Sequence, residues 1–439
     1  MARRRDRLVI RSSARDLGGI RVTYFRKLAA VAAFALAGIA TAGAQEIKTV
    51  FVIAMENHNW TQPANQFSGP IQQIFQNPNA PFINSLVNGT AFATINGQQV
   101  NISNQTAYAA NYHNVLATAS GSNPHIHPSE PNYLWAEAAT NFGVFNDSDP
   151  FSPQSGNGAI QNQDNQLHLV RLLTEAGRTW RSYQEDIDLV GGTSPTANAV
   201  LPRNLWTVPI TSFSGNFTSG TNQFNGSTQF NYAVKHNPQA FFTDSNGGND
   251  PTPANPLSQQ YAPLQQLFAD LANNTVANYN WITPDQFNDQ HTALKGGFMG
   301  QTGDAANILQ GDNFLKIVVP AIMASRAYRD HGAIIIWWDE AEGDGVTGDN
   351  PDDLTHTIGE IVVSPDAHHN VAGQPYASEV FLTHSSDVLT MQEIFHAKRP
   401  IILGDAIHAN DLSDLFEPGA ITGGDCDRDH DGDCDRDRH

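Results

Sequence analysis

Cysteine is almost absent from this sequence of 439 residues. Its two cysteines, Cys426 and Cys434, lie near the C-terminal end, so the body of the chain has none. This distribution excludes a disulfide-stabilised scaffold, although an exported chain can oxidise that single pair. Charged residues are also few, at 15% of the chain, and acidic residues outnumber basic ones by 44 to 24. The net charge of -20 argues against nucleic acid as a partner, because nucleic acids attract basic surfaces.

Long apolar runs are missing as well. The apolar segment at 28–40 (LAAVAAFALAGIA) has 13 residues, fewer than the roughly 20 that cross a bilayer as a helix. A basic leader over residues 1–27 precedes it, and an A-x-A cleavage pattern (AGA) follows it. These features predict a signal peptide over residues 1–44 and a secreted or periplasmic protein. A membrane anchor is the alternative, and we expect no stable membrane span elsewhere.

Short runs rich in β-branched and aromatic residues are present and predict buried strands. They lie at 48–55, 277–282, 332–338 and 358–363. Helical patterns cover 165–177, 259–273, 312–328 and 386–396. Strands that alternate with helices indicate an α/β fold, a sandwich with a mainly parallel central sheet. In such sheets the ligand crevice lies beyond the carboxyl ends of the strands.

Two of these strands end in pairs of oxygen-bearing side chains. Glu56 and Asn57 follow the first strand, and Asp339 and Glu340 follow the strand at 332–338. Ser129 stands just before a predicted helix, where backbone N–H groups favour an anion. Histidines are numerous around and after it: His113, His125, His127, His236, His291, His356 and His384.

Hydrolysis of a phosphate ester needs such groups. A divalent metal held by oxygen ligands neutralises charge on the phosphoryl group and lowers the pKa of a coordinated serine hydroxyl. Each feature also has a plainer explanation, since a serine before Glu-Pro-Asn is often only a helix cap. The conjunction of strand-end carboxylates with Ser129 favours a metal-assisted hydrolase.

Two segments differ from the predicted catalytic domain at 45–420. Residues 188–258 are rich in Asn, Gly, Ser and Thr and predict an insertion of loops and short strands, which either caps the site or decorates the surface. The tail at 421–439 places Asp427, Asp429 and Asp431 in a D-x-D-x-D-G pattern, which opens calcium loops. An EF-hand needs a Glu where this tail has Arg, so Ca²⁺ binding and a disordered acidic tail both stay open.

Blocks of the sequence in the range 47–396 also resemble a known family. KTVFVIAMENHNW resembles the opening strand and E-N metal motif of the phosphoesterase family that includes bacterial phospholipases C and secreted acid phosphatases. NYHNV and HPSEPNYL resemble its acid-phosphatase branch. Further blocks follow in the family's order: WRSYQEDI, KHNP, ITPDQFNDQH, IIIWWDEAEGD and THSSDVLTMQEIF. The resemblance implies a three-layer fold of the alkaline-phosphatase-like superfamily.

The resemblance also implies roles for single residues. A divalent metal would be held by Glu56, Asn57, Ser129, Asp339 and Glu340. Ser129 would attack phosphorus and form a phosphoserine. His384 and His291 would act at the phosphoryl oxygens or the leaving group, with Asp289 orienting one of them. Contacts to the substrate would come from Lys235, His236, Asn132 and His356.

The predicted function is therefore a secreted metal-dependent phosphomonoesterase acting on small phosphate esters. Glu340 stands where many phospholipases C have Asp, which favours the acid-phosphatase branch and leaves the identity of the metal open. The first alternative is a phospholipase C-type phosphodiesterase that binds a phospholipid headgroup. Its apolar approach surface would come from four aromatic residues of the insertion: Phe213, Phe217, Phe224 and Phe230. The second alternative is a non-enzymatic calcium-binding surface protein.

Overall fold

A computed structural model describes most of the chain after the predicted signal peptide. The described residues are 45–67, 71–114, 128–150, 163–189, 212–248, 250, 254–342, 354–370, 373–397 and 401–422, and they belong to one compact unit, Ala44–His439. The predicted signal peptide, His125 and His127, and the tail with Asp427, Asp429 and Asp431 lie outside the described residues.

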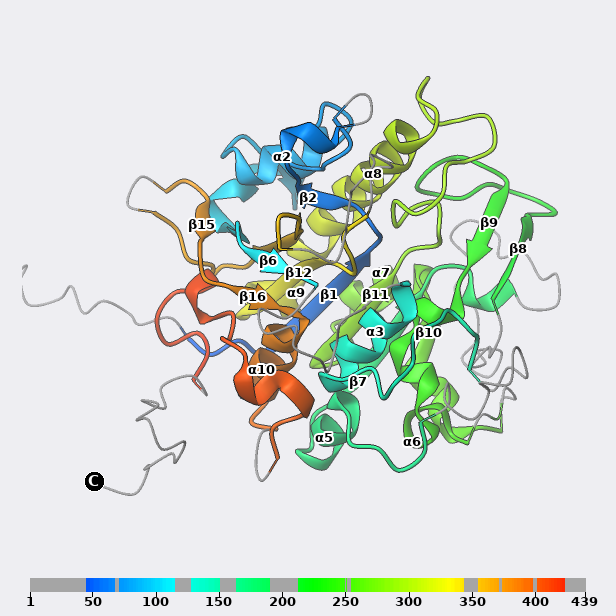
Figure 1. Cartoon of the computed structure of the whole chain (residues 1–439), viewed down its shortest axis with the longest axis vertical. Coiled ribbons are helices and arrows are strands. Elements are labelled where there is room, and N and C mark those ends of the chain that lie inside the picture. Colours follow the sequence, from blue (N-terminus) through cyan, green and yellow to red (C-terminus); the bar gives the residue numbers. More distant parts are fainter. Residues whose placement is uncertain are drawn as a thin grey trace, which may run out of the picture. The chain divides into compact units, whose positions relative to one another are not determined.

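An eight-stranded sheet forms the centre of this unit (Figure 1), in the order β10-β7-β11-β1-β12-β14-β5-β15. The strands are β1 (Thr49–Met55), β5 (Thr106–Ala109), β7 (Trp180–Gln184), β10 (Tyr261–Pro263), β11 (Tyr279–Thr283), β12 (Gly332–Trp338), β14 (Glu360–Val363) and β15 (Tyr376–Ser378). Every neighbouring pair is parallel except the two that involve β14. The prediction of a mainly parallel sheet is confirmed.

Shorter elements surround the sheet. Four two-stranded pairings join β2 (Asn59–Thr61) to β13 (Thr357–Ile358), β3 (Phe92–Ile95) to β4 (Gln98–Asn101), β6 (Tyr112–His113) to β16 (Leu382–Thr383), and β8 (Phe213–Asn216) to β9 (Gln229–Tyr232). The α-helices are α2 (Pro81–Val87), α3 (Ser129–Ala138), α5 (Leu169–Glu175), α6 (Thr243–Asn246), α7 (Gln265–Asn273), α8 (Asp304–Met323), α9 (Arg326–Arg329) and α10 (His384–Ile394). None of the helices in the described ranges has both the length and the apolarity needed to cross a membrane.

Helices cover both faces of the sheet. Helices α2 and α7 contact α8, whereas α3 and α5 contact α10. Successive residues of a strand point to opposite sides of the sheet. Two neighbouring residues of β12 therefore show which helices cover which face. Trp337 meets Tyr133 of α3, with ring centroids 5.4 Å apart. Trp338 lies beside Met55 in the sheet, and a Cβ at Gly311 of α8 would stand only 2.8 Å from the Met55 side chain. The three-layer arrangement is therefore also confirmed.

The sequence predictions of single elements had mixed outcomes. The strands at 48–55 and 332–338 are confirmed as β1 and β12. The helix predicted at 259–273 is wrong at its start, since residues 261–263 form β10 and α7 begins only at Gln265. The helix predicted at 312–328 begins earlier, at Asp304, and ends at Met323. Strands β5, β7 and β15 were not predicted, because three to five residues carry little periodicity.

The region predicted as an insertion has two parts with different packing. The hairpin β8–β9 fits the predicted short strands. Residues 234–241 instead form helical turns that pack on α3, and α6 after them packs on α5, so this part belongs to the body of the fold. Phe224 is 4% exposed and packs against Phe314 of α8, with ring centroids 4.6 Å apart. The prediction of Phe224 in an apolar approach surface is therefore wrong.

A buried histidine ties α3 to the elements beside it. His168 precedes α5, and its Nδ1 lies 2.8 Å from Oε1 of Glu137 in α3, while its Nε2 lies 2.7 Å from Oδ1 of Asp244 in α6. Burial alone lowers the pKa of His168, but the hydrogen bonds and charges of Asp244 and Glu137 outweigh it and raise the pKa above its usual value. His168 therefore ties the helix of Ser129 to α5 and α6 through one carboxylate at each ring nitrogen.

We predict that His168→Ala lowers the free energy of unfolding by about 3 kcal/mol at mildly acidic pH, because it leaves Glu137 buried without its charge partner. In the wild type, the contribution of a histidine with a raised pKa is complete below the unfolded value of about 6.5. It is lost as the pH rises through the native pKa. Denaturant unfolding across this range measures both effects. The matched control is His408→Ala at an exposed position, and a similar loss there would contradict the assignment.

Candidate active site

The carboxyl ends of three neighbouring strands bring acidic side chains to one edge of the sheet. Glu56 follows β1, Asp339 and Glu340 follow β12, and Asp289 lies in the loop after β11. Both β11 and β12 pair with β1 in parallel, so their ends coincide. Backbone hydrogen bonds fix the three ends together: Glu56 N donates to Asp289 O at 2.8 Å, and Asp339 N donates to Met55 O at 3.2 Å.

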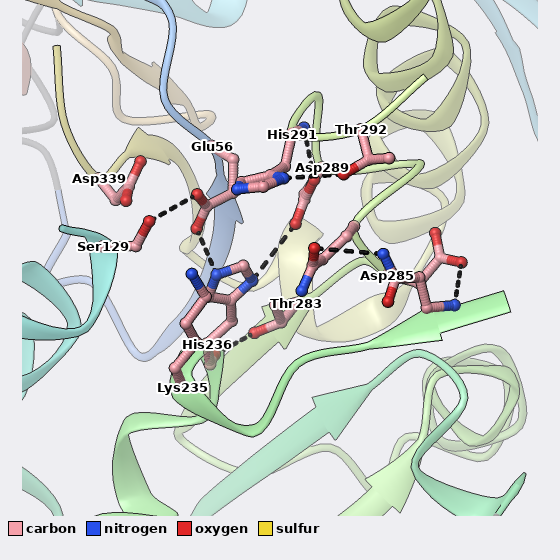
Figure 2. A network of polar contacts seen from close by, with 12 residues as sticks. Glu56, Ser129, Lys235, His236, Thr283, Asp285, Asp289, His291, Thr292 and Asp339 are labelled. Carbon is pink, nitrogen blue, oxygen red and sulfur yellow. Dashed lines mark hydrogen bonds and ion pairs between the residues drawn. The ribbon is translucent and has the colours of Figure 1, made fainter. Parts of the chain in front are cut away.

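Ser129 is the first residue of α3 and faces this edge. Pro128 occupies the cap position and makes no side-chain hydrogen bond to the helix start. The Ser129 hydroxyl instead lies 3.1 Å from Oε2 of Glu56 and 3.3 Å from Oε1 of Glu340. Figure 2 shows Ser129, Glu56 and Asp339 side by side, with His236 next to Glu56. The alternative that Ser129 is only a helix cap is therefore wrong.

Two further residues of α3 contact the same carboxylates. Asn132 donates from Nδ2 to Oε2 of Glu340 at 3.2 Å, and the Tyr133 hydroxyl donates to Oε1 of Glu56 at 2.6 Å. Residues three and four positions after Ser129 share its face of the helix. The sequence prediction missed Tyr133, although its i+4 spacing from Ser129 was a usable signal.

His236 lies between two of the buried carboxylates. Its Nε2 is 3.0 Å from Oε1 of Glu56 and its Nδ1 is 3.4 Å from Oδ2 of Asp289. Its ring stacks on Tyr133, with centroids 4.8 Å apart. Burial acts against both charges, but the mutual attraction of His236 and Glu56 outweighs it, so the pKa of His236 is raised and that of Glu56 is lowered. His236 thus neutralises one negative charge of the group.

Asp339 has one carboxylate oxygen that no hydrogen-bond donor of the described residues reaches. Its Oδ1 accepts from Asn57 N at 2.9 Å, but no donor of the described chain reaches the buried Oδ2. Burial and the nearby Glu56 and Glu340 raise the pKa of Asp339 well above its usual range. An all-oxygen donor set with excess negative charge suits a hard divalent cation. Ser129 joins Glu56 and Glu340 in this set, and the oxygens of the predicted ligands are of the kind that such an ion takes. A tighter group at the same edge is Glu56, His236 and Asp289, whose ligand atoms lie within 4.8 Å of one another.

The contacts of His384 fix its protonation state. Its Nδ1 accepts a hydrogen bond from Nε1 of Trp337 at 3.0 Å, because an indole N–H can only donate. Its Nε2 lies 2.5 Å from the carbonyl oxygen of Asp339, which can only accept. Burial lowers the pKa of His384 to about 3. The ring is therefore a neutral imidazole with its proton on Nε2, and it holds the backbone at Asp339.

His291 has a more open environment. Its backbone N–H donates to Oδ1 of Asp289 at 2.8 Å, and its ring Nδ1 lies 2.8 Å from the Thr292 hydroxyl. Its ring centroid is 6.3 Å from that of His236, and the two histidines appear on neighbouring loops in Figure 2. Within the described ranges Thr292 is the hydrogen-bond partner of the His291 ring. Burial lowers the pKa of His291 below its usual value.

Lys235 and His356 complete the predicted set. Lys235 donates from Nζ to Oδ2 of Asp147 at 2.8 Å, and Oδ1 of Asp147 accepts from Glu130 N at 3.1 Å. Asp147 thus connects Lys235 to the first turn of α3. His356 is buried next to His113, and its predicted contact with substrate stays a prediction.

Comparisons with known proteins show the family of the chain. The sequence model of the phosphoesterase family matches residues 39–398. A probable acid phosphatase of Kluyveromyces lactis is 28% identical over 191 residues, which are 43% of this chain and 36% of that protein. The match thus spans about a third of that relative's length.

Solved structures with low identity also match over most of the chain. A protein in the alkaline phosphatase superfamily from Vibrio parahaemolyticus is 14% identical, with a TM-score of 0.40 over 85% of this chain and 72% of that chain. A putative sulfatase from Bacteroides thetaiotaomicron is 12% identical, with a TM-score of 0.39 over 80% and 72%. These likenesses are too weak to carry an argument about the substrate.

We predict that Asp339→Asn raises the melting temperature of the chelator-treated protein by a few degrees. The substitution removes one of the buried like charges and keeps the oxygen that accepts from Asn57. Thermal unfolding monitored by circular dichroism in the presence of a chelator measures the change. Asp330→Asn, at an exposed position, is the control and should leave the melting temperature almost unchanged. A lower melting temperature for Asp339→Asn would contradict the inference that neighbouring carboxyl groups destabilise the site when no metal is bound.

Proposed function

The chain belongs to the phosphoesterase family, and from this premise we propose that it is a metal-dependent phosphatase that hydrolyses phosphate monoesters through a phosphoserine at Ser129. Family membership supports a hydrolase of phosphoric esters, and the similarity to a probable acid phosphatase supports monoesters as substrates. The observation that carries the proposal is the Ser129 hydroxyl, which is held between Glu56 and Glu340 at the start of α3.

The metal would be held by the oxygen ligands around Ser129: Glu56, Asn57, Asp339 and Glu340. When bound there, a divalent ion supplies positive charge for the phosphoryl oxygens and lowers the pKa of the serine hydroxyl. The donor-free oxygen of Asp339 supports this assignment.

In the proposed reaction the Ser129 oxygen forms a bond to phosphorus while the bond to the leaving oxygen breaks. The hydroxyl proton is directed at carboxylate oxygens of Glu56 and Glu340, which can accept it. Lys235, only 12% exposed, supplies a positive charge for the second negative charge of a monoester. Asn132 keeps Glu340 oriented through its amide. Water then hydrolyses the phosphoserine and releases phosphate.

His291 is the proposed donor of the proton to the leaving oxygen. His384 does not suit that role, because Trp337 and Asp339 occupy its two ring nitrogens. His384 is instead proposed as a positioning residue for Asp339. Asp289 accepts the backbone N–H of His291 and so holds the donor's loop against β1.

The proposed site of action is outside the cytoplasm, in the periplasm or the medium. The support for this is the basic leader, the apolar run at 28–40 and the A-x-A pattern that follows it.

We predict that Ser129→Ala lowers turnover of p-nitrophenyl phosphate at least about a thousandfold, because alanine removes the oxygen that attacks phosphorus. Chelator treatment of the wild type should abolish turnover, and a divalent metal should restore it. Release of p-nitrophenol measures both. Ser413→Ala, at an exposed position outside the site, is the matched control and should keep full activity.

A second substrate separates the proposed function from the alternatives. Hydrolysis of p-nitrophenyl phosphorylcholine in place of the monoester would replace the phosphatase with a phospholipase C-type phosphodiesterase. Hydrolysis of neither substrate would favour the non-enzymatic calcium-binding protein. Full activity of Ser129→Ala would overturn Ser129 as the nucleophile.

We predict that His291→Gln and His384→Gln differ in their dependence on the leaving group. Loss of a proton donor slows esters with a basic leaving oxygen, such as phenyl phosphate, far more than p-nitrophenyl phosphate. His291→Gln should therefore show a strong leaving-group dependence, whereas His384→Gln should slow both substrates by a similar factor. The ratio of kcat values for the two esters measures this. Equal ratios for both variants would contradict the assignment of His291.

A further inference from the structure

A second group of buried carboxylates lies at the same edge of the sheet, beyond β11 from Ser129. Glu185 and Asp186 directly follow β7, and Asp285 follows β11, the strand beside it. The three side chains belong to residues that are 4%, 5% and 1% exposed. One oxygen of each lies within 4.8 Å of the others. None of the roles proposed above uses these residues.

Glu185 and Asp285 are surrounded by hydrogen-bond donors. Glu185 accepts from the side-chain amides of Asn222 at 2.6 Å and Asn288 at 2.9 Å, and from Asp285 N at 2.9 Å. Asp285 in turn accepts from three backbone N–H groups, those of Phe287, Asn288 and Asn231. Donors on every side favour the ionised form of a carboxyl group. Burial nevertheless outweighs these donors and raises the pKa of Glu185, and burial together with the nearby Glu185 and Asp186 raises the pKa of Asp285 well above its usual range. The two groups therefore need a positive charge beside them to stay ionised.

Asp186 is different, because no donor in the described part of the chain reaches its buried Oδ2. Its side chain lies against the carboxyl group of Asp285. Burial and the charges of Glu185 and Asp188 raise the pKa of Asp186 well above its usual range. The charged groups that act on Glu185, Asp186 and Asp285 are all carboxylates. A positive species is needed between these side chains, and it is either a proton or a cation.

We propose that Glu185, Asp186 and Asp285 bind a calcium ion, at a site separate from the metal proposed at Ser129. Three carboxylates and no nitrogen or sulfur ligand make a site for a hard cation. Ca²⁺ accepts carboxylate oxygens in flexible geometry, whereas Mg²⁺ demands a near-ideal octahedron and retains water. Because the three carboxyl groups are crowded and buried, they suit Ca²⁺, which loses its bound water more readily than Mg²⁺.

The site joins the β8–β9 hairpin to the sheet. Asn222 lies in the hairpin's connecting segment and contacts Glu185, while Asn231 of β9 donates its backbone N–H to Asp285 and accepts from Gln286 N at 2.9 Å. The loop that begins at Asp285 continues to Asp289 and His291 of the candidate active site. The calcium ion would therefore stabilise the hairpin and this loop together.

The test compares full-length variants after removal of metal by a chelator and dialysis. Each is titrated with CaCl₂, and the melting temperature and the number of bound Ca²⁺ ions, from equilibrium dialysis, are measured. The wild type should gain several degrees on adding Ca²⁺, since binding to the native state alone stabilises it. Asp186→Asn, which keeps the shape of the side chain, should lose this gain and bind one ion fewer.

Three controls identify the site. Asp188→Asn removes a neighbouring carboxylate outside the group and should keep the response to Ca²⁺. Asp339→Asn should also keep it, which separates this ion from the metal at Ser129. A variant with Asn at positions 427, 429 and 431 excludes the acidic tail as the source of the response.

Two outcomes would overturn the proposal. The first is an equal number of bound Ca²⁺ ions in the wild type and Asp186→Asn, with both variants folded by circular dichroism. The second concerns the melting temperature. In the wild type it would not respond to Ca²⁺ but would increase as the pH is lowered, and in Asp186→Asn it would respond neither to Ca²⁺ nor to pH. That result would show that a proton occupies the place between the carboxyl groups.

Discussion

Negative charge buried at one edge of the central sheet is the constraint on which the rest of the site depends. Glu56, Asp339 and Glu340 are almost inaccessible to water, and they lie at the ends of strands that pair with each other. Removing several like charges from water is costly unless opposite charge or hydrogen-bond donors compensate for it. Here His236, the amide of Asn132 and the hydroxyls of Ser129 and Tyr133 provide part of that compensation. A divalent cation would provide the remainder.

The position of Ser129 depends on contacts far from it in the sequence. Its helix is held at one end by Asp147, which accepts the N–H of Glu130. At the other end Glu137 pairs with His168, and His168 also pairs with Asp244. These contacts leave the Ser129 hydroxyl facing the strand-end carboxylates instead of its own helix. Rigid support of this kind keeps a reacting group within the narrow range of positions that catalysis requires.

Much of the candidate site could be predicted because its residues follow strong local patterns. Glu56 and Asp339 come directly after the two most apolar strands, and parallel strands bring their ends to a common edge. The pairing of His236 with Asp289 was not predicted, because it depends on the course of a loop between β11 and α8. The contacts that fix the protonation state of His384 were not predicted either. Its contacts with Trp337 and Asp339 join segments about 45 residues apart, and no sequence pattern reports them.

The sequence by itself determined the α/β class, the central strands β1 and β12 and the family of the chain, because these rest on hydrophobic periodicity and on motifs within short segments. The tertiary structure decided which carboxylates lie together at the sheet edge, that His236 is paired with Glu56, and that Glu185, Asp186 and Asp285 form a group of their own. Those properties depend on distances across the sheet and on exclusion of water. Both arise only when strands that are far apart in the chain lie side by side.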